Sequence, residues 1–180
     1  METPFSDNYR FLARYNHWFN LRLYAACDGL GDAARQQDNG AFFGSIHRTL
    51  NHLLVADQIW LRRFVDCGTA HGAPWPVLTD AIRMPPQHPL NQPLHADWTA
   101  LRAHREALDS AIETWLADAP PDMAGWTMRY SNTAGTQRQH PLWQALTHFF
   151  NHQTHHRGQV TTLLSQQGVD VGNTDLISLV

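Results

Sequence analysis

The sequence contains no lysine, and all 13 of its basic residues are arginine. This absence excludes catalysis through a lysine Schiff base and phosphate binding by a P-loop lysine. Cysteine is also scarce, because Cys27 and Cys67 are the only two and their spacing fits neither a metal site nor a redox motif. We therefore expect a reduced, cytoplasmic protein in which both cysteines are inert core thiols.

Long apolar runs and strong charge are missing as well. No run approaches the ~20 apolar residues of a membrane-spanning helix, and the first ten residues lack the apolar stretch of a signal peptide. The net charge of −3 gives no indication of a nucleic-acid or anionic-membrane partner. With 180 residues, 43% of them hydrophobic, the chain has the size and composition of a single domain, which we expect to span residues 1–180.

Four segments carry apolar residues at steps of three and four, which predicts four amphipathic helices. The predicted helices cover about residues 6–28, 45–67, 95–117 and 141–168. Four long helices with short links and one long connection are typical of a four-helix bundle, so the expected fold class is all-α.

Two connections interrupt this pattern. Six of the ten prolines lie in residues 68–94, which predicts an extended crossover between the second and third helices that lets them run parallel. Residues 126–130 alternate in polarity before Gly135, which predicts a small β-hairpin ahead of the fourth helix. The tail, residues 169–180, is apolar enough to pack against the helices.

Histidine is abundant, with 12 residues, and four of them lie close together in the fourth predicted helix. His152 and His156 are one turn apart on one face, so their rings can chelate one divalent metal ion. His148 lies one turn earlier and competes as a partner for His152, whereas His155 is rotated by about 100° toward the outside. The spacing alone leaves a metal site and hydrogen-bonded core histidines equally open.

A third ligand would have to come from another helix. His52 lies in the most apolar stretch of the second predicted helix, so we expect it to point inward, whereas His47, near the helix start, is expected to be solvated. The third helix offers His104 and Glu106, and the first offers His17.

Several other polar residues have two interpretations. Asn16 and Asn20 either hydrogen-bond a ligand histidine or are solvated or capping amides. Gln159 either contacts substrate or is a satisfied helix amide, and Arg157 is expected to form a surface or interface ion pair rather than bind an anionic substrate. Asp57 is expected to be an exposed helix acid. Core packing, rather than a pocket lining, is expected for four aromatic residues: Tyr15, Trp18, Trp60 and Trp143.

Parts of three predicted helices and the tail resemble the DinB-like (DinB/YfiT-like) family of proposed metalloenzymes. Residues 152–159 and 166–168 resemble the end of its signature, and residues 50–61 resemble its second-helix pattern. Residues 15–23 resemble its first-helix opening, and residues 174–176 also fit. The crossover and the third helix carry no matching signature.

The resemblance implies a four-helix bundle with a long link, commonly a homodimer. It also implies one divalent metal ion per chain, held by one histidine of the second helix and a pair from the fourth, which correspond to His52, His152 and His156. Zinc or nickel is expected first, with iron or manganese as alternatives. Three imidazoles leave coordination positions open, as in catalytic sites.

The activity implied by the resemblance is metal-dependent transfer to or from a low-molecular-weight thiol, such as glutathione, mycothiol or bacillithiol. A thiol-dependent isomerase or a metal-dependent hydrolase would use the same site, and no acid or base is assigned. A different class of function is a non-catalytic, stress-related metal-binding or assembly module, in which His148 or His155 closes the site as a fourth ligand. The partner expected of an enzyme is a small-molecule substrate, with no nucleic acid and no membrane.

Overall fold

The computed structural model describes residues 4–180, and most of them are helical. The predicted helical class and the small hairpin are therefore confirmed. In chain order, the elements are α1 (Pro4–Asp28), α2 (Asp32–Gln36), α3 (Ile46–Ala70), α4 (Pro76–Ala81), α5 (Trp98–Asp118), η1 (Met123–Gly125), β1 (Thr127–Ser131), β2 (Gln137–Pro141), α6 (Leu142–Gln166) and η2 (Leu176–Leu179).

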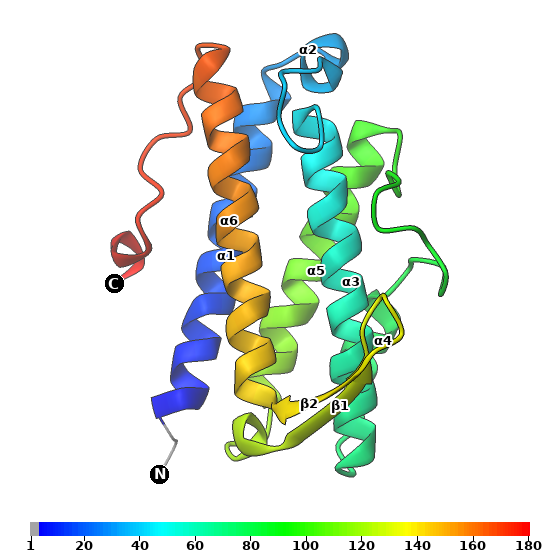
Figure 1. The fold of residues 1–180 in the computed structure, drawn as a ribbon. Coiled ribbons are helices and arrows are strands. Elements are labelled where there is room, and N and C mark those ends of the chain that lie inside the picture. The colour runs from blue at the N-terminus through cyan, green and yellow to red at the C-terminus, as the bar shows by residue number, and fades with distance from the viewer. Residues whose placement is uncertain (1–3) are drawn as a thin grey trace.

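The four long helices lie side by side, with α1 and α6 running in one direction and α3 and α5 in the other (Figure 1). Helix α1 contacts α5 and α6, and α3 contacts α6 and α5. Their facing sides bury one continuous apolar cluster that includes Leu23, Leu54, Trp115 and Phe149. Burial of each such side chain contributes about 1.5–3 kcal/mol, so the apolar periodicity accounts for the packing of the helices.

Capping hydrogen bonds and backbone conformation explain where α3 and α5 begin and where α6 ends. Ser45 Oγ accepts a hydrogen bond from the backbone N–H of Arg48 at 3.2 Å, and Asp97 caps α5 in the same way through the N–H of Ala100 at 2.7 Å. Helix α6 ends before Gly168, whose φ of 75° lies in the left-handed region that glycine adopts without strain.

The connection between α3 and α5 is less extended than predicted. Helix α3 continues to Ala70, and the short helix α4 lies within the stretch that was expected to be extended throughout. Pro76 occupies the first turn of α4, where the missing N–H has no helical partner to lose. The proline-rich stretch therefore excludes only a long helix. Residues 82–97 carry the chain back to the start of α5 without regular structure (Figure 1).

Two buried amide side chains of α3 bind residues 82–97, the returning segment. Gln58 Oε1 accepts hydrogen bonds from the backbone N–H groups of Arg83 and Met84, both at 2.9 Å. Asn51 accepts from the N–H of His95 at 2.9 Å and donates to its carbonyl at 3.0 Å. These contacts hold both ends of residues 82–97 against α3.

The hairpin and the tail complete the fold. Strand β1 pairs antiparallel with β2, and Asn132 Oδ1 accepts the N–H groups of Ala134 and Thr136 in the turn. The hairpin lies at the opposite end of the long helices from α2 (Figure 1). The tail packs in part, because Tyr15 donates to the carbonyl of Thr174 at 2.8 Å while Ile177 stays 69% exposed. Among the helices of residues 4–180, none combines the length and apolar character of a membrane crossing.

The packing of Gly68 in α3 gives a testable prediction. A Cβ atom at this position would lie 2.5 Å from the carbonyl oxygen of Ala73 and 2.7 Å from the ring of Trp75. Gly68→Ala should therefore lower the free energy of unfolding by about 1–3 kcal/mol, measured by urea denaturation, despite the better helix propensity of alanine.

Gly158 in α6 is the matched control, because a Cβ atom there would meet nothing within 4 Å. Gly158→Ala should be neutral or stabilising by up to about 1 kcal/mol. Equal effects of the two substitutions would contradict this description of the packing.

Candidate metal centre

The structure brings His52 of α3 together with His152 and His156 of α6. Their ligand atoms all lie within 4.8 Å of one another, and no other group of three candidate ligands meets this condition within residues 4–180. The Nε2 atom of His152 lies 3.4 Å from Nε2 of His52 and 3.1 Å from Nε2 of His156. The inward orientation predicted for His52 is confirmed, since only 7% of the residue is exposed.

Hydrogen bonds on the far sides of two rings define their protonation. Nδ1 of His156 lies 2.7 Å from Oε1 of Gln159, and Nδ1 of His52 lies 3.5 Å from the carbonyl oxygen of Leu90. Because both oxygens can only accept, each Nδ1 carries the hydrogen and each Nε2 presents a lone pair. The Nε2 atom of His152 carries at most one hydrogen, so it can donate to only one of its two neighbours.

A cation at the centre of the cluster would satisfy all three nitrogens. Imidazole nitrogens that bind one zinc ion at about 2.0–2.1 Å in tetrahedral geometry lie about 3.3 Å apart, which is close to the observed separations. The donor set of three neutral imidazoles also suits nickel and iron. The residues present therefore fit a divalent metal ion.

The surroundings keep the three rings neutral. Burial lowers the pKa of His52 to about 4 and that of His152 to about 3, and it also lowers the pKa of His156. Repulsion between the neighbouring rings acts in the same direction. Phe43 stacks on His52, with ring centroids 4.0 Å apart and an angle of 22° between the planes. The lone pairs are thus available near neutral pH.

The two remaining histidines of α6 lie outside this group. His155 is exposed, as predicted, and accepts from the Gln159 amide at 3.4 Å. His148 is also exposed and packs against Trp60, with ring centroids 4.9 Å apart, and its ring lies 5.8 Å from that of His152, the neighbour for which it was predicted to compete.

The other candidate ligands have different partners. His47 is buried rather than solvated, and its Nε2 donates to the carbonyl of His95 at 2.9 Å. His104 pairs with His95, and Glu106 binds Arg102. His17 forms an ion pair with a glutamate of α5.

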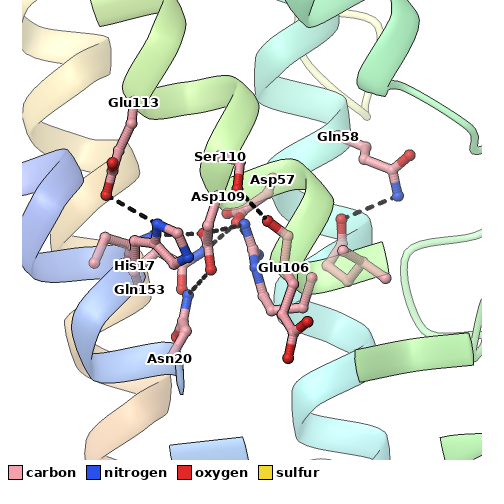
Figure 2. Close-up of polar contacts among 12 residues, drawn as sticks. His17, Asn20, Asp57, Gln58, Glu106, Asp109, Ser110, Glu113 and Gln153 are labelled. Atoms are coloured by element: carbon pink, nitrogen blue, oxygen red, sulfur yellow. Dashed lines mark hydrogen bonds and ion pairs between the residues drawn. The ribbon is translucent and has the colours of Figure 1, made fainter. Parts of the chain in front are cut away.

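A buried polar network lies beside the three histidines and connects all four long helices. Arg105 of α5 contacts Asp57 of α3 at 2.5 Å and Asp109 at 2.6 Å. The amides of Asn16 and Asn20 of α1 donate to Asp109 at 3.0 and 2.9 Å, and Figure 2 shows the second of these contacts.

Two residues of α6 complete the network. Gln153 donates to Asp57, and Arg157 donates to Asn16. Each directly follows a histidine of the cluster in the sequence, so this network fixes the rotation of α6 about its axis. Burial raises the pKa of Asp57 to about 7 against the opposing effect of Arg105.

Several sequence interpretations are wrong because of this network. Asp57 is fully buried rather than exposed, and Arg157 is 1% exposed, so it forms no surface ion pair. Asn16 and Asn20 bind Asp109 and neither solvent nor a histidine of the cluster. Both cysteines are buried free thiols, as predicted.

Comparison with known proteins agrees with this arrangement. A model of the DinB family matches residues 4–179, nearly the whole chain. The chain belongs to the DinB family. No match to a curated protein or to a solved structure was found.

Sequence reasoning on this DinB-family chain missed four residues next to the candidate metal centre. Phe42 and Phe43 precede α3, and Leu90 and Asn91 lie in the returning segment; all four line a hollow beside the histidines. Two adjacent phenylalanines before a helix cap were the only available signal. Gln159, interpreted either as a substrate contact or as a satisfied helix amide, fits both, because its carbonyl oxygen binds His156 and the residue also lines this hollow.

The histidine pair that anchors the returning segment gives a pH-dependent prediction. His95 Nε2 and His104 Nδ1 lie 2.8 Å apart, and burial lowers the pKa of His104 to about 4. Below the unfolded-state pKa of about 6.5, the unfolded chain binds a proton that the folded chain excludes, so stability falls as the pH decreases.

His104→Gln removes this titration. Between pH 7 and pH 4.5, wild type should lose about 2 kcal/mol more of its unfolding free energy than the variant, measured by urea denaturation at each pH. Parallel pH profiles for the two proteins would contradict the assignment.

Proposed function

We propose that His52, His152 and His156 hold one divalent metal ion per chain and that the protein is a metal-dependent enzyme. The observation that supports this most strongly is the convergence of three Nε2 atoms that a single proton cannot satisfy. Membership of the DinB family supports the same ligand set. Zinc or nickel suits the three imidazoles best, with iron or manganese as alternatives.

The proposed reaction is transfer to or from a low-molecular-weight thiol of the glutathione, mycothiol or bacillithiol type. A metal ion held by three neutral imidazoles keeps open coordination positions and lowers the pKa of a water or thiol bound there. The chain's own residues keep the ligand rings neutral, orient His156 through Gln159 and leave a hollow beside the cluster. This hollow favours an enzyme over a closed metal-binding or assembly module, and a metal-dependent hydrolase would use the same features.

The remaining proposals concern the whole molecule. We propose that residues 1–180 form one four-helix-bundle domain with a proline-rich crossover, supported by the continuous core shared by α1, α3, α5 and α6. A homodimer and a cytoplasmic location follow from family resemblance and from the free cysteines. The acidic net charge supports a small-molecule substrate rather than nucleic acid.

The metal site is tested by removing its ligands one at a time. Purified protein should contain about one divalent ion per chain, measured by elemental analysis after dialysis. His52→Ala, His152→Ala and His156→Ala should each abolish this binding while the helical circular dichroism is retained. His148→Ala is the matched control on α6 and should retain full metal content.

Two results would overturn the proposal. Full metal retention in the His152→Ala and His156→Ala proteins would place the site elsewhere. Loss of metal in His148→Ala equal to that in His152→Ala would mean that the ligand set is wrong.

Gln159 provides a separate test of ligand orientation. Gln159→Leu removes the acceptor that keeps the hydrogen on Nδ1 of His156, so metal affinity should fall about 10–100-fold, measured by competition with a chelating dye. Gln144→Leu, at an exposed position of the same helix, should leave the affinity unchanged. Equal affinities for the two variants would remove Gln159 from the site.

A further inference from the structure

The hollow beside the three histidines has a volume of about 640 Å³, within the usual ~300–1,000 Å³ of small-molecule sites. His52 and His156 lie at its floor. Its walls come from three separate parts of the chain: the loop before α3, residues 82–97 and α6. A molecule in this hollow would therefore lie directly against the proposed metal centre.

The lining of this hollow contains no carboxylate and no guanidinium group. Asp38 and Arg48 lie in an adjoining hollow that shares five lining residues with it: Phe42, Phe43, His52, Leu90 and Asn91. Both hollows therefore reach His52, and the one without an acidic residue or an arginine is the more apolar. The Gln159 amide, on the same wall, is already engaged by His155 and His156.

Two large apolar side chains stand exposed at this hollow. Phe42 is 87% exposed and Leu90 is 40% exposed, although apolar side chains of this size gain about 1.5–3 kcal/mol from burial. Exposed apolar groups that flank a concave site mark a binding surface. Phe43, next to Phe42 in the chain, is instead packed on His52.

A tight turn holds Phe42 in this position. The backbone N–H of Gly44 donates to the carbonyl of Ala41 at 2.7 Å, and the N–H of Asn39 donates to the carbonyl of Gly44 at 2.8 Å. Gly44 has a φ of 79°, which glycine adopts readily. The exposure of Phe42 is therefore set by a hydrogen-bonded turn.

We propose that the hollow selects a ligand with an apolar, preferably aromatic, body, and that Phe42 and Leu90 determine this specificity. The ligand's donor atom reaches the three-histidine centre while its body is covered by these two side chains. This inference rests on the proposed metal-dependent function and narrows its substrate class.

The test uses zinc-loaded protein and three probe thiols, with binding measured by isothermal titration calorimetry. Benzyl mercaptan is aromatic, 2-mercaptoethanol is small and thioglycerol is polar, and none of the three has a carboxylate that could bind the zinc ion. Benzyl mercaptan should bind at least about 10-fold more tightly than thioglycerol, because only its body can be buried against apolar walls.

Two substitutions test whether the lining of the hollow causes the tighter binding of benzyl mercaptan. Phe42→Ala and Leu90→Ala should each weaken benzyl mercaptan about 5–10-fold while leaving 2-mercaptoethanol and zinc affinity unchanged. Leu21→Ala, at an exposed leucine of α1, is the matched control and should change nothing.

Several outcomes would overturn the inference. One is tighter binding of thioglycerol than of benzyl mercaptan, and another is an equal loss for all three thiols in Phe42→Ala. A third is a change of solution mass in Phe42→Ala with unaltered thiol preference, which would assign Phe42 to contact with a second copy of the chain. A metal-free arm separates this inference from the proposed function. Without metal, benzyl alcohol but not glycerol should shift the backbone NMR signals of Phe42 and Leu90, and the absence of such shifts overturns the hollow's role even if zinc binds.

Discussion

The guanidinium group of Arg105 lies between the carboxylates of Asp57 and Asp109 in the buried interior of the four long helices. Taking these charges out of water is unfavourable, and removing one member of such a pair costs about 3–5 kcal/mol because the others stay buried without compensation. The alternatives to the observed packing are therefore strongly disfavoured. A rotation of α3 or α5 that separated Arg105 from Asp57 would leave the buried Asp57 carboxylate without its cationic partner.

The candidate metal centre depends on this constraint. Gln153 and Arg157 reach into the network from one face of α6, and His152 and His156 project from positions directly before them. Because the contacts of Gln153 and Arg157 fix the rotation of α6, they also fix the direction in which His152 and His156 point. The carboxylate of Asp57, five residues after His52, fixes the rotation of α3 in the same way through its contact with Arg105. The polar contacts of Asp57, Gln153 and Arg157 thus set the rotation of α3 and α6 at which the three rings converge.

Much of this could be predicted from the sequence, since the apolar period identified the four long helices and the spacing of His152 and His156 placed both rings on one face. The buried charges could not be predicted. Asp57, Arg105 and Arg157 resemble exposed helix residues, because a single sequence does not show which charged side chains meet across helices. The walls of the hollow escaped prediction for a similar reason. Phe42 and Leu90 are far apart in the chain and are brought together by backbone hydrogen bonds to the Asn51 and Gln58 amides and within the turn before α3.

The turn of residues 41–44 holds two consecutive phenylalanines in different surroundings. Phe43 packs on the ring of His52, whereas Phe42 is exposed to solvent. Only the backbone geometry of the turn distinguishes them. The ring that packs on the histidine cluster and the ring that faces outward are neighbours in the sequence, and the turn separates their surroundings. Substitution of Phe42 would therefore alter the outer surface of the hollow without removing the ring that covers His52.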